Sequence, residues 1–158
     1  MTHTNAPSRT APLGDTAVLG ARALAQLVDA IVSLVVFAVA AGGTALLLGG
    51  AAVTRQSLFA TFMAVGPVAM LVGALAASAL PVLLEWAWNG ATVGKRLVDI
   101  RVVPVDGGSV GLGTAFTRNL FAGIDAAFFY LVGLASMIAS PDRQRVGDRV
   151  AGTVVVRA

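Results

Sequence analysis

The sequence predicts an all-α integral membrane protein with two long transmembrane helices, a third membrane segment interrupted by polar residues, and a small two-stranded cytoplasmic sheet. Apolar residues make up 57% of the 158 residues and charged residues only 12%, against the ~25% charged residues of a typical soluble domain. Residues 30–54 and 56–84 contain no ionisable side chain. Each stretch is longer than the ~20 residues that a helix needs to cross the hydrocarbon core of a bilayer.

The first helix is predicted over residues 18–48 and the second over residues 57–88. A buried helix pair of a soluble bundle would be shorter and would carry a polar face. A cleaved signal peptide would have an apolar region of only ~7–15 residues. Pro67 and Pro81 predict kinks in the second helix. Small residues recur every four positions in both helices, which favours close helix contact: Ala41, Ala45 and Gly49, and Ala69, Gly73 and Ala77.

Two short segments near the end of the chain are predicted to form β-strands. Residues 97–105 alternate, are rich in Val and Ile, and lead into the turn signal Asp106-Gly107-Gly108. Residues 153–156 form a second β-branched run after Gly152. Because one strand alone leaves its backbone groups unpaired, we expect the two to pair outside the bilayer. Residues 1–17 are predicted to be a disordered cytoplasmic tail, and residues 18–158 the membrane domain.

The distribution of Lys and Arg predicts the topology. Basic residues cluster near the start of the first helix, at 95–101 and after Ser140, whereas Arg55 stands alone between the two long helices. The positive-inside rule therefore places the N-terminus, residues 95–108 and the C-terminus in the cytoplasm and Arg55 outside. Residues 111–140 form the third apolar region. A plain third crossing would separate the two strands, so we expect this region to enter and return, or to bend into two half-helices, although a full crossing stays open.

A polar stripe lies on the first predicted helix. Arg22, Gln26, Asp29 and Ser33 are spaced four, three and four residues apart, so they share one narrow face. An unpaired charge near the bilayer centre costs about 2.5–3.5 kcal/mol or more. This face is therefore expected to point into the helix bundle or into a wet cavity.

The third region repeats the spacing of this stripe. Arg118 precedes Asp125 by the same seven residues that separate Arg22 from Asp29, and Asp148 follows near the second strand. These five charged residues are the candidate site. They form either a structural charge network, in which the arginines neutralise the aspartates, or a path for an ion or proton, or a ligand site. In a transporter, Asp29 is the residue expected to carry the ion or proton, and an internal repeat would suit such a site.

Other motifs indicate little chemistry. Glu85 at the end of the second helix is interpreted as a carboxylate that faces water, with an intramembrane proton carrier as the alternative. The segment from Gly90 to Lys95 is one residue short of a phosphate-binding loop. The chain has no cysteine, and its one histidine, His3, lies in the polar tail. We therefore expect no enzymatic activity, no cofactor, no metal site and no binding of nucleic acid.

The order of these features resembles the RDD family of small bacterial membrane proteins, named for one arginine and two aspartates. Arg22 fits the family arginine, Asp29 fits the first aspartate, and Asp148 in Arg-Val-Gly-Asp-Arg-Val-Ala-Gly-Thr fits the second. The segment Gly-Lys-Arg-Leu-Val-Asp-Ile-Arg-Val-Val at 94–103 and the Arg118-Asn-Leu triplet also agree. One departure is Asp99, where many relatives have a glycine before the strand.

The resemblance implies a multi-pass protein of the plasma membrane without a settled activity. It also implies a transport role for a small ion or solute, including cation/proton exchange. The alternative is an accessory or scaffold protein that binds or stabilises a membrane partner. The expected partners are the lipid bilayer and either further copies of the chain or another membrane protein, because so few helices can hardly enclose a path alone.

Overall fold

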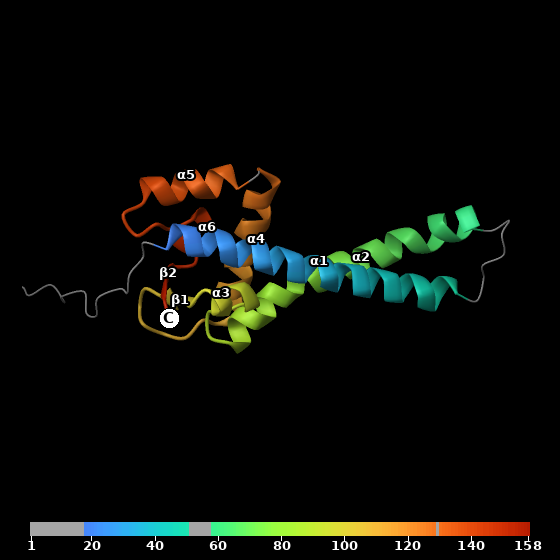
Figure 1. Cartoon of the computed structure of the whole chain (residues 1–158), viewed down its shortest axis with the longest axis horizontal. Coiled ribbons are helices and arrows are strands. Elements are labelled where there is room, and N and C mark those ends of the chain that lie inside the picture. Colours follow the sequence, from blue (N-terminus) through green and yellow to red (C-terminus); the bar gives the residue numbers. More distant parts are fainter. Residues whose placement is uncertain (1–17, 51–57, 129) are drawn as a thin grey trace, which may run out of the picture.

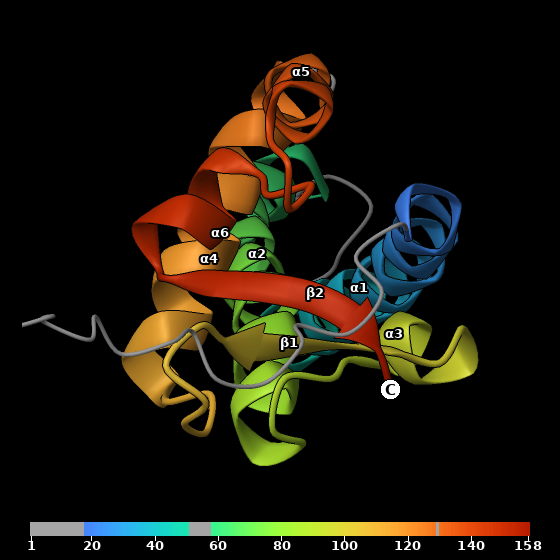
Figure 2. The ribbon, with the colours of Figure 1, turned by 90° about the vertical axis from the view of Figure 1, so that its left-hand side faces the viewer.

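Two long antiparallel helices pack at one of their ends against several shorter helices and a two-stranded sheet (Figure 1). The structure is a computed structural model that describes residues 18–50, 58–128 and 130–158. The outer halves of the long helices project away from everything else, and the remaining elements gather around the opposite end (Figures 1 and 2). In chain order the elements are α1 (Leu19–Gly49), α2 (Leu58–Ala87), α3 (Val93–Leu97), β1 (Ile100–Pro104), α4 (Leu112–Ala127), α5 (Leu131–Ala139), α6 (Val146–Val150) and β2 (Thr153–Arg157).

Helices α1 and α2 are long and apolar enough to cross a membrane. They contain 31 and 30 residues, or about 46 and 45 Å at ~1.5 Å per residue, whereas the hydrocarbon core is ~30 Å thick. Their apolar side chains face outward: Leu47 is 85% exposed and Phe59 is 76% exposed. The predicted bounds are confirmed to within a residue where the chain is described. The predicted tail at 1–17 and the Arg55 loop lie outside the described residues.

The small residues of α1 and α2 allow the close contact that their spacing predicts. Gly73 is buried, and a Cβ atom there would lie 2.9 Å from both the carbonyl oxygen of Phe37 and the Cβ of Ala41. A Cβ atom on Gly49 would lie 3.3 Å from Thr61. Helix α2 continues through Pro67 and Pro81 as one element. Backbone contact at Gly73 therefore fixes how α1 and α2 pack.

The two predicted strands pair as an antiparallel sheet. Val102 pairs with Val155 and Val103 with Val154, which confirms the expected pairing. The first strand is shorter than predicted, because residues 93–97 form α3 and Asp99 turns the chain with a φ of +51°. Glycine adopts this left-handed conformation most easily, so Asp99 places an ordinary side chain at a turn that favours glycine.

The apolar core lies between the sheet and the nearest turns of α1, α2 and α4. Val18, Ala25, Ile100, Val102, Val110, Ala115 and Val155 are its buried members. The N–H of Ala158 also donates to the carbonyl oxygen of Asp99 and so extends the contact beyond β2. The core therefore fixes the start of α1 against the sheet.

The third apolar region forms two short helices with a bend between them. Tyr130 sits at the bend with a φ of +59°, and α5 then runs back toward the end of the molecule that holds the sheet (Figure 1). The 16 residues of α4 and the 9 residues of α5 correspond to about 24 and 14 Å. Neither helix is long enough to cross a bilayer alone, which agrees with the expected bend into two half-helices.

The backbone contact at Gly73 generates a stability prediction. In the variant Gly73→Val, the new side chain meets the Phe37 backbone, so we expect the free energy of unfolding to fall by about 1–3 kcal/mol. Gly42→Val is the matched control, because nothing lies within 4 Å of a Cβ atom there. Thermal unfolding of both purified variants in detergent measures the difference. Equal melting temperatures would contradict this helix contact.

Candidate functional site

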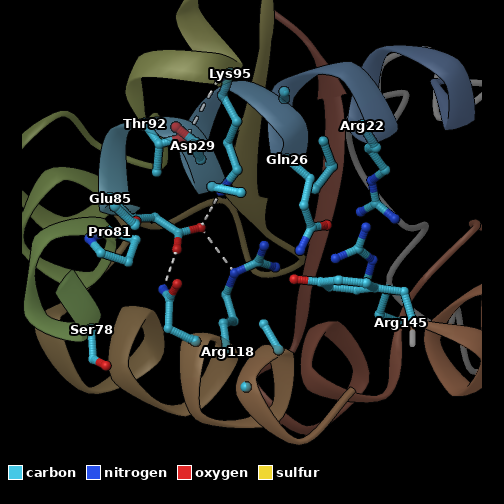
Figure 3. A pocket seen from close by; sticks show the side chains of 18 of the residues that line it. Arg22, Gln26, Asp29, Ser78, Pro81, Glu85, Thr92, Lys95, Arg118 and Arg145 are labelled. Atoms are coloured by element: carbon cyan, nitrogen blue, oxygen red, sulfur yellow. Dashed lines mark hydrogen bonds and ion pairs between the residues drawn. The ribbon is translucent and has the colours of Figure 1, made fainter. Parts of the chain in front are cut away.

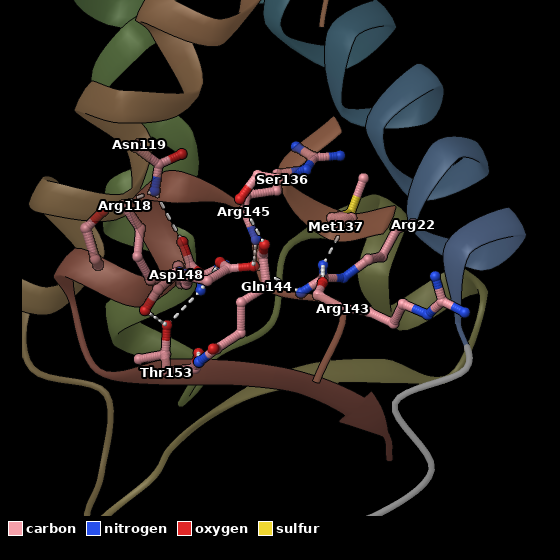
Figure 4. Close-up of polar contacts among 12 residues, drawn as sticks. Arg22, Arg118, Asn119, Ser136, Met137, Arg143, Gln144, Arg145, Asp148 and Thr153 are labelled. Carbon is pink, nitrogen blue, oxygen red and sulfur yellow. Dashed lines mark hydrogen bonds and ion pairs between the residues drawn. The ribbon is translucent and has the colours of Figure 1, made fainter. Parts of the chain in front are cut away.

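Asp148 binds two arginines that come from distant parts of the chain (Figure 4). Arg22 of α1 donates from Nη2 to Asp148 Oδ2 at 2.8 Å, and Arg118 of α4 donates from Nη1 to Asp148 Oδ1. The contact is nearly dry, since Arg22 is 6% exposed and Asp148 is 3% exposed. Charge-assisted hydrogen bonds of this kind are about twice as strong as neutral ones. The pair of bonds therefore joins α1, α4 and α6 at one carboxylate.

Glu85 is a second buried carboxylate in the same network (Figure 3). Its Oε1 accepts from Lys95 Nζ at 2.8 Å and from Arg118 Nε at 3.0 Å, and its Oε2 accepts from Asn119 Nδ2 at 2.8 Å. Glu85 is 1% exposed. The interpretation of Glu85 as a water-facing carboxylate is therefore wrong, because α3 and α4 cover the end of α2.

Local sequence explains how Asp148 is held in place. Its Oδ2 also accepts the backbone N–H of Arg145 at 3.0 Å, which caps the first turn of α6. Gly147 leaves room for α4, since a Cβ atom there would lie 3.0 Å from the carbonyl oxygen of Arg118. Thr153 accepts from Arg118 Nη1 at 2.6 Å and donates to the carbonyl oxygen of Asp148. The start of β2 thus completes the surroundings of the carboxylate.

The electrostatics of the network favour its ionised form. Burial alone would raise the pKa of Asp148, but Arg118 and then Arg22 outweigh it, so this pKa lies below its ordinary value. Burial lowers the pKa of the Lys95 ammonium, and Glu85 only partly opposes that shift. The salt bridges join three cations, Arg22, Lys95 and Arg118, to two carboxylates. Three minus two leaves one surplus positive charge.

Asp29 has partners other than the arginines. Its Oδ2 accepts from the hydroxyl of Thr92 at 2.5 Å and its Oδ1 accepts from the N–H of Gly94 at 2.8 Å. Gly94 lies directly on α1, because a Cβ atom there would approach the carbonyl oxygen of Ala25 to 2.1 Å. Asp29 therefore anchors the first turn of α3 to α1 and does not directly neutralise Arg22 or Arg118.

Asp125 repeats the arrangement of Asp29. Its Oδ1 accepts from the N–H of Gly133 in the first turn of α5 at 2.6 Å, while its Oδ2 is buried without a hydrogen-bond partner among the described residues. In both Arg-to-Asp segments the arginine binds Asp148 and the aspartate holds a glycine N–H of a short helix. The two segments with equal spacing thus make the same pair of contacts.

A cavity of about 580 Å³ lies beside the network, between α1, α2 and α4. We call it the charged cavity. The whole polar stripe of α1 lines it, as the spacing of Arg22, Gln26, Asp29 and Ser33 predicts. Further along α1 the lining becomes apolar at Leu34 and Phe37. Among the described residues, no group of three or more His, Cys, Asp and Glu side chains is placed to hold a metal ion.

Comparison with known proteins identifies the family. The sequence pattern described as the RDD family matches residues 16–152. This chain belongs to the RDD family. The uncharacterised protein YckC of Bacillus subtilis (strain 168) is 38% identical over 81 residues, which cover 49% of this chain and 54% of that protein. The chain thus spans about half the length of this curated relative. No solved structure matches the chain.

The arginine and the two aspartates that fit the family name have two separate structural roles. Arg22 and Asp148 form one buried ion pair, and Asp29 holds α3 on the same helix as Arg22. Sequence reasoning missed Glu85 and Lys95, which complete the network. A signal was available: a carboxylate that directly follows 29 residues without charge needs a partner, and Lys95 is the next cation in the chain.

The double pair at Asp148 generates a second prediction. In Asp148→Asn, Arg22 and Arg118 lose a buried counter-charge, so we expect a loss of about 3–5 kcal/mol in the free energy of unfolding. Denaturant titration in detergent at neutral pH measures the loss. Because the pKa of Asp148 is depressed, its contribution is present above the unfolded pKa and disappears as pH falls through the folded pKa. Asp106→Asn, in an exposed turn, is the control, and equal stability of the two variants would refute a structural role for the pair.

Proposed function

We propose that this protein is a multi-pass protein of the plasma membrane that transports a small ion or solute, with the charged cavity as its binding site. The observation that carries this proposal is a cavity with charged side chains in its lining that lies against two apolar helices of membrane-spanning length. Polar side chains at membrane depth are costly unless they line a wet cavity or pair with one another. Here the charged side chains line a cavity and also pair with one another.

The charges lie close to the predicted boundary of the bilayer. Residues 30–49 of α1 span about 30 Å at ~1.5 Å per residue, and Asp29 comes immediately before them. Gly73 packs against Phe37, which sets α1 and α2 antiparallel in register. Glu85 therefore lies near the same end of the hairpin as Asp29, and the cavity extends from that end to Leu34 and Phe37. A solute that enters from the charged end would reach the membrane interior, and assembly of several copies would complete the path.

Helices α4 and α5 fit a segment that enters the cytoplasmic leaflet and returns. One face of α4 carries exposed apolar side chains spaced four residues apart, Leu112, Phe116, Leu120 and Ile124, and the exposed Phe128 directly follows the helix. The opposite face carries Arg118 and Asn119 into the network. An outward apolar face on a helix too short to cross is what a re-entrant segment requires.

The same exposed face supports the accessory function as a second candidate. Leu131 and Ile138 of α5 are also exposed, so the two helices present apolar surface that another membrane protein could cover. The buried ion pairs would then stabilise a scaffold and not line a path. Transport measurements separate the two functions, because a scaffold alone moves nothing.

Flux through sealed liposomes that contain only this protein tests the transport proposal. We expect saturable flux of at least one member of a panel of cations and anions, measured with and without a pH gradient. Ser33→Phe places a ring in the charged cavity and should abolish this flux. Val39→Phe is the matched control, since Val39 is exposed on α1 away from the cavity and should retain wild-type flux. Absence of flux for every solute would favour the accessory function.

The proposed topology predicts where single cysteines can be labelled in this cysteine-free chain. The sheet joins residues 100–104 to residues 153–157, so cysteines at Asp106 and Ala158 should share one side, the cytoplasm. A cysteine at Arg55 should lie outside. An impermeant thiol reagent applied to intact cells should modify the third variant and spare the other two. Labelling at Ala158 in intact cells would instead require a third full crossing.

A further inference from the structure

The charges that line the cavity are unequal in number. The cations are Arg22, Lys95, Arg118 and Arg145, and the carboxylates are Asp29, Glu85 and Asp148. Four minus three leaves one surplus positive charge. An occupant that carries a negative charge would therefore neutralise the lining, whereas a cation would add to the surplus.

The carboxylates of the cavity are already occupied. Asp148 accepts from two arginines, and Glu85 accepts from a lysine, an arginine and an asparagine. Asp29 accepts from a hydroxyl and a backbone N–H. A cation would have to compete with these partners for the oxygen atoms, which argues against a cation site here.

The donors of the cavity, by contrast, are not all used. Within the described chain, the guanidinium of Arg145 forms no ion pair with a carboxylate, and its Nε is buried without a partner. The Nε of Arg22 is likewise buried without a partner among the described residues, while its Nη1 donates to the carbonyl oxygen of Arg143 at 2.6 Å and its Nη2 to Asp148 at 2.8 Å. Buried charged donors that lack acceptors are costly. Both side chains line the cavity.

The two guanidinium groups approach the same part of the cavity. Figure 3 shows Arg22 and Arg145 directed toward one another from α1 and from the start of α6. The ring of Tyr130 lies 6.0 Å from the Arg145 guanidinium and borders the cavity beside it. Two like charges placed together in a poorly solvated site repel one another, whereas an anion bound between them would attract both.

We propose that the charged cavity binds a phosphate-type oxyanion between Arg145 and Arg22. Guanidinium groups match the oxygen geometry of phosphate and are weakly hydrated, so they suit a partly buried anion site. The anion is either a free phosphate or the headgroup of an anionic phospholipid, whose acyl chain would follow the apolar lining at Leu34 and Phe37. This inference rests on the proposed function only in its choice of the cavity, and it replaces the cation that the family resemblance implies.

Binding to purified full-length protein in zwitterionic nanodiscs tests the inference without any measurement of flux. One arm titrates inorganic phosphate, with sodium chloride at equal ionic strength as the reference. The other arm titrates a short-chain phosphatidylglycerol, with the matching phosphatidylcholine as the reference. We expect saturable binding in at least one arm, and the arm that responds identifies the source of the phosphate group.

Two variants assign the binding to this cavity. Arg145→Gln should weaken binding about tenfold or more, or ~1.4 kcal/mol, and should still fold because this guanidinium forms no ion pair among the described residues. Arg149→Gln is the matched control, because Arg149 is exposed on α6, the helix that Arg145 directly precedes. No saturable binding in either arm, or equal weakening by both variants, would overturn the inference. Binding that depends on Arg145 without any flux would retain the oxyanion site and reject transport. Cation flux without such binding would retain transport and reject the oxyanion site.

Discussion

The fold depends on the pairing of two buried arginines with the carboxylate of Asp148. Arg22 belongs to the long apolar helix α1, whereas Arg118 belongs to α4, which packs against α2 and α6 and which Arg118 also joins to Asp148 and Glu85. Removal of a charged group from water costs several kcal/mol per ion unless good geometry compensates it. Both oxygens of Asp148 and a backbone N–H are used, so the compensation is nearly complete. The position of α6, and with it the sheet, follows from this requirement.

Sequence alone predicted those parts of the fold that depend on composition and spacing. The two long helices follow from stretches without charge, and the sheet follows from two β-branched runs beside glycine turns. The polar stripe of α1 was predictable because helical periodicity places Arg22, Gln26, Asp29 and Ser33 on one face. The small residues near Gly73 likewise indicated helix contact before any partner was known.

The partners of each charge were less predictable, since they depend on how distant elements meet. Asp29 lies on the same face of α1 as Arg22, yet its oxygens accept from Thr92 and Gly94. The short helices α3 and α6 contain five residues each, too few for a periodic pattern. Glu85 was misinterpreted because its position at a helix end suggested solvent, while the elements that cover it come from residues 93–127. The tertiary arrangement shows that Glu85, at this end of α2, is 1% exposed.

The separation of Arg22 and Asp148 in sequence has a consequence for biosynthesis. The two residues are 126 positions apart, and at a translation rate of ~5–20 residues per second Arg22 leaves the ribosome on the order of 6 to 25 s before its counter-charge. During that interval Arg22 has no Asp148 to pair with, so its guanidinium must stay solvated or bind another acceptor. Synthesis of the α1–α2 hairpin and closure of its charged end are therefore separate steps in time, and the second step waits for the segment that contains Asp148.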